Sequence, residues 1–167
     1  MPFEKYQPHH IGIKAGKDIE RAFCGQSECS YTKKIQYKTY EEAKKEAIRM
    51  QPQTLPLPAT KLINRLNELY PDLSGKMRYY TSLGTAFDVY HGVDAFITLG
   101  DTYIVTLDIT NNSSKESAKA DIVVYTGYKE DGSIDFSDMQ INILAQRIGK
   151  TFVEKYAKTS QRKSQHM

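Results

Sequence analysis

Two apolar runs joined by a short polar connection constrain the fold of this chain more than any other stretch. The runs, Gly92 to Leu99 and Tyr103 to Thr110, are rich in β-branched and aromatic residues, and Gly100, Asp101 and Thr102 lie between them. This pattern predicts a β-hairpin. Each run contains an aspartate, Asp94 or Asp108, although carboxylates are rare inside strands of such composition.

The length of the connection decides whether these two carboxyl groups meet. With a three-residue connection, Gly100 to Thr102, Asp94 falls directly opposite Asp108 on one face of the hairpin. With two residues, Asp94 pairs with Leu107 and the carboxyl groups are separated. Two carboxylates beside backbone oxygens form a pocket suited to Mg²⁺ or Mn²⁺. A metal site here therefore predicts the three-residue connection.

The remaining elements are expected on both sides of the hairpin in the chain. Capping signals and apolar periodicity predict helices at Thr39–Gln51, Ala59–Tyr70 and Phe136–Tyr156. Strands are expected at Lys76–Gly84 and Asp121–Tyr128, and short elements at Lys17–Phe23 (helix), Lys33–Lys38 (strand) and Ser113–Ala120 (helical turns). This order predicts an α/β fold with a mixed β-sheet flanked by helices.

Three prolines between residues 52 and 58 indicate a boundary in the chain. We expect residues 1–57 to form an N-terminal extension with one clear helix and a Pro-rich connector, and residues 58–157 to form the main fold. Residues 158–167 are basic and are expected to be disordered. A chain of 167 residues fits one domain with a sizeable core.

Composition restricts the location and partners of the protein. No apolar run is long enough to span a membrane, and the first residues lack the pattern of a signal peptide. We therefore expect a soluble, cytoplasmic protein without a membrane partner. The net charge of +3 is compatible with a polyanionic partner without requiring one.

The two cysteines are too few for a disulfide scaffold in a chain of this length. Cys24 and Cys29, together with His9 and His10, form one candidate zinc site. Adjacent histidines fit a single tetrahedral ion poorly, and two reduced thiols are the alternative.

The segment from Ala59 to Tyr156 resembles the PD-(D/E)XK nuclease superfamily. The core of that superfamily is a helix, a three-stranded meander, a helix and a strand, and its short motifs match Gly92-Val93-Asp94 and Asp108-Ile109-Thr110. The resemblance implies a restriction-endonuclease-like core and a Mg²⁺-dependent or Mn²⁺-dependent endonuclease that hydrolyses DNA. A homodimer is common when such a domain cuts both strands of a duplex.

The resemblance also implies roles for individual residues. Asp94 and Asp108 would bind the metal, and the carbonyl group of Ile109 would add a ligand. Glu68, on the helix before the meander, corresponds to an acidic residue that many members contribute from that helix. In such enzymes the metal polarises the scissile phosphate and activates water, so no nucleophilic side chain is needed.

Thr110 departs from the family pattern, which has a lysine at this position. Some members carry the lysine on the following helix instead, and Lys115 and Lys119 lie in the corresponding segment, with Lys119 slightly preferred. Without a lysine at the carboxylates, the domain would bind nucleic acid without cutting it, for instance as an assembly module of a phage or mobile element. A third hypothesis, a purely structural acidic pair, predicts neither bound metal nor bound DNA.

Other residues have a structural and a functional interpretation side by side. Asp88 belongs either to the site or to a turn cap, and His91 either contacts a phosphate or forms a structural hydrogen bond. An N-terminal segment mixes rings that can stack on bases with cations that can follow a phosphate backbone. Its residues are Tyr31, Lys33, Lys34, Tyr37, Lys38, Tyr40, Lys44 and Lys45. Three glutamates in the same segment favour an ordinary solvated surface.

Overall fold

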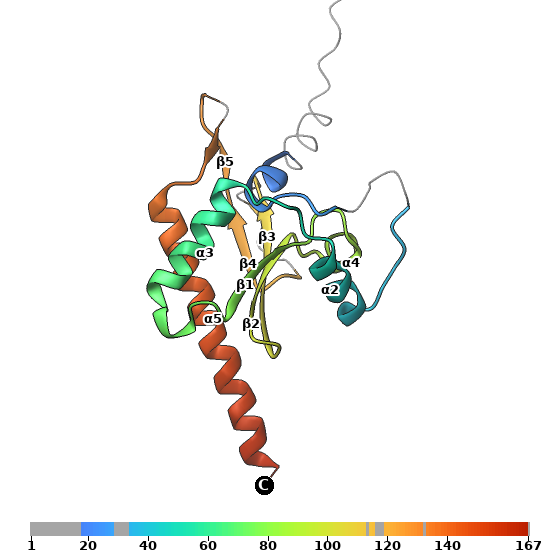
Figure 1. Cartoon of the computed structure of the whole chain (residues 1–167), viewed down its shortest axis with the longest axis vertical. Helices are drawn as coiled ribbons and strands as arrows, with labels where there is room; N and C mark the ends of the chain where they lie inside the picture. The colour runs from blue at the N-terminus through green and yellow to red at the C-terminus, as the bar shows by residue number, and fades with distance from the viewer. Residues whose placement is uncertain (1–17, 29–33, 113, 116–118, 132, 167) are drawn as a thin grey trace, which may run out of the picture.

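A computed structural model of the chain describes residues 18–28, 34–112, 114–115, 119–131 and 133–166. A four-stranded sheet with strand order β1-β2-β3-β4 forms its centre (Figure 1). The strands are β1 (Met77–Thr81), β2 (Ala95–Leu99), β3 (Tyr103–Thr110) and β4 (Ile122–Tyr125). The first three strands form an antiparallel meander and β4 runs parallel to β3. The predicted α/β fold with a mixed sheet is confirmed.

Helices cover both faces of this sheet (Figure 1). One face packs against α3 (Leu57–Leu69), α5 (Asp138–Gln165) and the helical residues 18–24. The other packs against α2 (Tyr40–Arg49) and α4 (Ala86–His91). A short 3-10 helix, η1 (Pro71–Leu73), follows α3, and a small ribbon of β5 (Gly127–Tyr128) and β6 (Ile134–Asp135) precedes α5.

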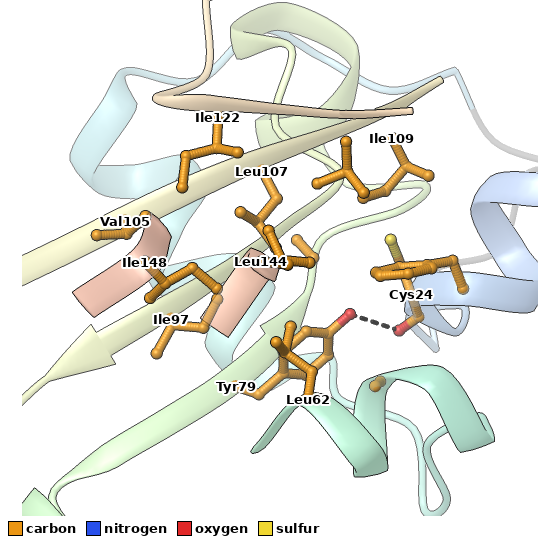
Figure 2. Packing of buried hydrophobic residues seen from close by; sticks show 14 of the residues in the cluster. Cys24, Leu62, Tyr79, Ile97, Val105, Leu107, Ile109, Ile122, Leu144 and Ile148 are labelled. Carbon is orange, nitrogen blue, oxygen red and sulfur yellow. Dashed lines mark hydrogen bonds between the residues drawn. The ribbon is translucent and has the colours of Figure 1, made fainter. Parts of the chain in front are cut away.

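Alternation along the strands sends side chains into two separate cores. Ile97, Val105 and Leu107 point into the larger core, where they pack with residues of α3 and α5 (Figure 2). Phe96 and Ile104 point to the opposite face, against α2 and α4. Each fully buried aliphatic or aromatic side chain contributes about 1.5–3 kcal/mol to folding, so both faces hold the sheet in place.

The described part of the N-terminal extension packs on the same sheet. Ile19 and Phe23 belong to the larger core, and Ala43 and Ala47 of α2 belong to the smaller one. The hydroxyl group of Tyr79 donates to the carbonyl oxygen of Cys24 at 3.2 Å, which ties helical residues 18–24 to β1 (Figure 2).

The register of β2 and β3 confirms the three-residue connection. Leu99 pairs with Tyr103 and Ala95 pairs with Leu107, so three residues, 100–102, join the strands. The paired residues end at Ala95 and Leu107, and the N–H of Asp94 donates to the carbonyl oxygen of the same Leu107 at 2.9 Å. The direct pairing of Asp94 with Asp108 that the metal-site hypothesis expects is therefore not formed.

Several predicted elements differ from the structure. The strand predicted from Gly92 begins at Ala95, because α4 occupies the preceding residues and Gly92 ends that helix with φ at +65°. The strand predicted over Asp121–Tyr128 is divided between β4 and β5 at Thr126. Residues 34–38 of the predicted strand Lys33–Lys38 are not in a strand. They lie beside α4, and the sheet ladder does not include them.

The C-terminal segment also differs from its prediction. Residues 158–165 continue α5 as a helix, so the prediction of a disordered tail is wrong for them. Their lysine, arginine, glutamine and serine residues are compatible with a helix once the packed part of α5 has nucleated it. Of the helical turns predicted over Ser113–Ala120, residues 114, 115, 119 and 120 are described and are not helical.

Within the described residues, none of the helices has both the length and the apolar character of a membrane span.

Gly100 offers a test of how the connection fixes the register. Its φ is +57°, and a Cβ atom built on it would meet nothing within 4 Å. We expect Gly100→Ala to lower the free energy of unfolding by about 1–2 kcal/mol, because an L-residue is strained in the left-handed region. The matched control is Gly127→Ala, where space is equally open and φ is not left-handed. Urea denaturation of both variants measures the difference, and an equal effect at both positions would contradict the expectation.

Candidate metal centre at the end of strands β2 and β3

Asp94 lies immediately before β2 and is fixed from three sides. Its N–H donates to the carbonyl oxygen of Leu107 and its carbonyl oxygen accepts from the N–H of Ser82, both at 2.9 Å. Its carboxylate oxygen Oδ2 accepts a hydrogen bond from the N–H of Ile109 at 2.7 Å. Because β2 begins only at Ala95, the Asp94 carboxylate satisfies the N–H of Ile109 in place of a strand carbonyl oxygen. Only 5% of the Asp94 residue is exposed.

Asp108 lies near the end of β3, between two residues of the larger core. Alternation turns its side chain to the opposite face of the sheet, where the residue is 7% exposed. Its Oδ2 forms an ion pair with the ammonium group of Lys115 at 2.5 Å. Of the two lysines proposed from the sequence, Lys115 is therefore the one that reaches a carboxylate of the site.

Lys119, the slightly preferred candidate, lies beside α4 instead. Its ammonium group donates to the carbonyl oxygen of Tyr90 at 3.2 Å, and the stem of its side chain approaches Gly92. Thr110 is half-buried, and its hydroxyl oxygen accepts from the N–H of Asn112 at 3.0 Å. The threonine at the motif position therefore caps the turn after β3.

Glu68 is not at this site. It is exposed on α3, where its carboxylate pairs with Arg65 at 2.9 Å. The acidic residue that the structure brings near Asp94 is Glu20, from the helical residues 18–24. The sequence signal for Glu20 was weak, because its segment lies far from the hairpin in the chain and shows only a short helical pattern.

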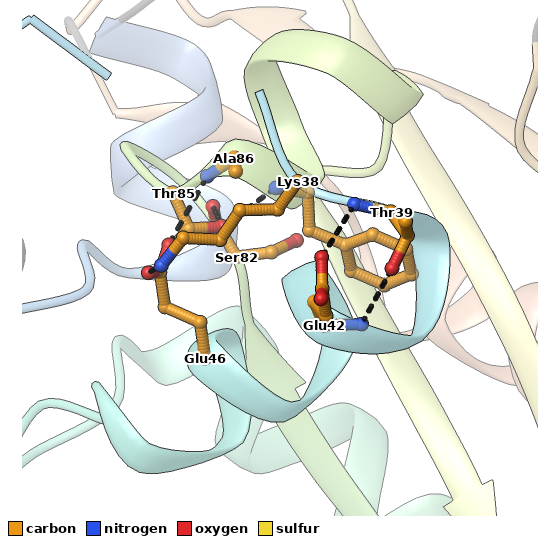
Figure 3. A network of polar contacts seen from close by, with 8 residues as sticks. Lys38, Thr39, Glu42, Glu46, Ser82, Thr85 and Ala86 are labelled. Carbon is orange, nitrogen blue, oxygen red and sulfur yellow. Dashed lines mark hydrogen bonds and ion pairs between the residues drawn. The ribbon is translucent and has the colours of Figure 1, made fainter. Parts of the chain in front are cut away.

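The segment that leads into Asp94 is held by small polar residues that sequence reasoning missed. Ser82 donates its hydroxyl to the carbonyl oxygen of Val93, and Thr85 donates its hydroxyl to the carbonyl oxygen of Ser82 at 2.7 Å. Thr85 also caps α4 by accepting from the N–H of Phe87 at 3.2 Å. Figure 3 shows Ser82 and Thr85 next to α2, where the carboxylate of Glu46 accepts from the N–H of Ala86 at 3.5 Å.

Burial and neighbouring acids change the ionisation of Asp94. Burial is the largest cause that raises the pKa of Asp94, to about 9, and the negative charges of Glu20, Asp88 and Asp108 act in the same direction. The hydrogen bond from Ile109 acts in the opposite direction but is outweighed. Without a cation, the carboxyl group therefore holds a proton at neutral pH.

The donor set fits a hard divalent cation in part. Among the described residues, no three His, Cys, Asp or Glu side chains are arranged to hold a metal ion by themselves. Asp94 and Asp108 nevertheless supply two oxygen donors. In a strand, N–H and C=O of one residue face the same neighbour, so the carbonyl of Ile109 also faces the Asp94 side. Mg²⁺ is commonly bound by one or two carboxylates together with water and phosphate oxygens, which matches this set.

The other residues considered from the sequence have structural contacts. Asp88 accepts from the N–H of Gly84 at 3.0 Å, and Nε2 of His91 lies 2.8 Å from the carbonyl oxygen of Lys38. Cys24 is a buried free thiol whose pKa is raised, chiefly by burial. The other three residues of the candidate zinc site, His9, His10 and Cys29, lie outside the described residues.

Comparisons with known proteins leave the residues themselves as the basis for a functional proposal. Models of known protein families gave no match to the chain, and neither did curated proteins or solved structures.

The raised pKa of Asp94 has a consequence for stability. An unfolded aspartate has a pKa of about 3.9, so below that pH the carboxyl is protonated in both states. Between about pH 4 and pH 9 the unfolded chain releases the proton while the folded chain retains it. The free energy of unfolding therefore falls by up to about 1.4 kcal/mol for each pH unit in this window.

Asp94→Asn removes this ionisation and keeps an oxygen that can accept from Ile109. We expect the variant and the wild-type protein to be similarly stable at pH 4, with the variant increasingly more stable from pH 5 to pH 8. Urea denaturation at several pH values without divalent metal measures this. Asp101→Asn, at an exposed carboxyl in the same hairpin, is the control and should give no such growing difference. A constant difference between Asp94→Asn and wild type across this range would contradict the assignment.

Proposed function

We propose that this protein is a nuclease that uses Mg²⁺ or Mn²⁺ to hydrolyse phosphodiester bonds in DNA. The observation that carries the proposal is a pair of buried carboxyl groups at one end of the sheet, because the Asp94 carboxylate accepts from the N–H of Ile109, the residue after Asp108. Such an arrangement destabilises a fold unless a cation or a proton neutralises it. A perturbed acidic pair of this kind is typical of a functional site.

The order of elements also supports the proposal. A helix, α3, precedes an antiparallel meander, and a further strand, β4, then runs parallel to β3 at the opposite edge from β1. The helix, the meander and the further strand are also parts of the core implied by the resemblance to PD-(D/E)XK nucleases. The described residues between β3 and β4 lack the helix of that core, α4 lies between β1 and β2, and Thr110 replaces the motif lysine.

Three residues of the chain would have separate roles in such a reaction. A bound divalent cation would polarise the phosphate and lower the pKa of a water molecule. Asp94 and Asp108 supply negative charge for the cation, and the Asp94 proton must leave before the carboxylate can bind it. Lys115, which neutralises Asp108 here, supplies positive charge next to the place where a phosphate would approach.

The first test removes one carboxylate. We expect the wild-type protein to cleave DNA with Mg²⁺ or Mn²⁺ and not with EDTA, and Asp108→Asn to reduce cleavage by about 100-fold or more. A gel assay with labelled DNA measures this, with Asp101→Asn as the control. Cleavage at the wild-type rate by Asp108→Asn would refute the proposed role of Asp108.

The second test separates the two lysines. We expect Lys115→Ala to lower kcat for cleavage by about 10-fold to 1000-fold, because it removes the cation that contacts the site carboxylate. Lys119→Ala should act mainly on KM, since its ammonium group contacts the backbone of α4. The opposite pattern would assign the catalytic charge to Lys119.

A second candidate function is favoured by Thr110. Its hydroxyl caps the turn after β3, and it provides no positive charge for the transition state. A non-catalytic protein that binds nucleic acid, for example in the assembly of a phage or mobile element, would need no such charge. DNA binding without cleavage across several divalent metals would favour this function. Either function would be exercised in the cytoplasm, and a homodimer would allow both strands of a duplex to be engaged.

A further inference from the structure

Four aromatic side chains form a surface cluster beside α4. This ring cluster consists of Tyr37, Tyr40, Tyr90 and His91. The rings of Tyr37 and Tyr90 meet edge to face, with centroids 5.4 Å apart, and the His91 ring lies 6.0 Å from Tyr37 and 5.6 Å from Tyr40. The sequence had shown the two N-terminal tyrosines only as part of a mixed segment. The fold brings them to the α4 rings from more than fifty positions away.

The ring cluster is held in place and yet partly open to solvent. The hydroxyl of Tyr90 donates to the carbonyl oxygen of Ile35 at 2.7 Å, and the His91 ring is fixed by the carbonyl oxygen of Lys38. Tyr37 is 66% exposed and Tyr40 is 39% exposed. Rings that are fixed before binding lose little conformational entropy when a ligand stacks on them.

The position of the ring cluster connects it to the candidate metal centre. His91 precedes Asp94 by three residues, so their Cα atoms are at most about 11 Å apart. Lys119 lies beside the segment that joins the two features, because its ammonium group donates to the carbonyl oxygen of Tyr90 while its stem approaches Gly92. A strand whose phosphate reached the carboxylates would therefore have its next nucleotides within reach of the rings.

The charges around the ring cluster favour a polyanion. Burial raises the pKa of Tyr40, and the negative charges of Asp121 and Glu41 act in the same direction. Both carboxylates are already paired, Asp121 with Lys155 at 2.7 Å and Glu41 with Lys44 at 2.9 Å. Lys119, in contrast, contacts the carbonyl oxygen of Tyr90 and has no carboxylate partner within the part of the chain that the structure describes. Rings beside such a cation suit a strand that offers both bases and phosphates.

We propose that the ring cluster is a base-stacking surface that holds an unpaired DNA strand beside the candidate metal centre. This inference deepens the proposed nuclease function and rests on it for the orientation of the strand. Bases within a duplex already stack on one another, whereas unpaired bases are free to stack on protein rings. The protein therefore prefers single-stranded DNA, or the single-stranded part of a branched substrate, over continuous duplex.

The chain contains no tryptophan, which allows a direct test of stacking. Tyr37→Trp introduces a single indole at the exposed ring of the cluster. Tyr156→Trp is the matched control, because Tyr156 is 61% exposed but lies on α5, on the other side of the sheet. With an oligonucleotide of mixed sequence in EDTA, we expect quenching of the indole fluorescence at position 37 and little at position 156. Equal quenching at both positions, or none at position 37, would overturn the inference.

Affinity gives a second readout that does not depend on cleavage. We expect Tyr37→Ala to weaken single-stranded DNA binding by about 5-fold to 150-fold, the range expected for losing one stacked base, and Tyr156→Ala to leave it unchanged. Unchanged folding of both variants is checked by thermal denaturation. If Tyr37→Ala binds like wild type while cleavage still requires Asp108, the stacking surface is refuted and the nuclease proposal stands. If binding requires Tyr37 but no metal supports cleavage, the stacking surface is supported and the nuclease proposal fails.

Discussion

The hydrogen bond between the Ile109 N–H and the Asp94 carboxylate closes the central sheet at the level where β2 has ended. A buried backbone N–H without a partner costs about 1–3 kcal/mol, so β3 can extend past β2 only if some group replaces the missing strand. An aspartate provides that group, but it also brings a buried carboxyl next to Glu20 and Asp88. The end of the sheet is therefore closed by a residue whose charge the fold disfavours.

The position of this carboxyl depends on elements that are distant in the chain. The backbone N–H and the hydroxyl of Ser82, just after β1, hold the carbonyl oxygens of Asp94 and Val93. Thr85 links that turn to the start of α4, and α4 in turn packs against α2 (Figure 3). The small core between α2 and α4 therefore does more than cover a sheet face. It fixes where the chain enters β2, and with it the side chain of Asp94.

Local patterns were sufficient to predict the centre of the fold but not its surroundings. The boundaries of β3 followed from alternating apolar residues, a signal that acts over a few residues. The turn signal left a connection of two or three residues open, and only the metal-site hypothesis selected three. Helix α4 was missed because its six residues, AFDVYH, show no amphipathic repeat, and its cap by Thr85 is a local signal that was overlooked. The approach of Glu20 to Asp94 depends on packing of helical residues 18–24 against the sheet, which no local pattern encodes. Lys115 was a candidate, but choosing it over Lys119 required the path of the chain after β3.

The pairing of Lys115 with Asp108 bears on the absent motif lysine. A lysine at position 110 would project from the sheet end on the same face as Asp108, since the two positions are two residues apart on one strand. Lys115 delivers its ammonium group to that carboxylate from the segment after β3, where its side chain is about one-third exposed. The charge is therefore present but is attached to a less constrained part of the chain than a strand. Catalysis that depends on it would be sensitive to how substrate binding positions this segment.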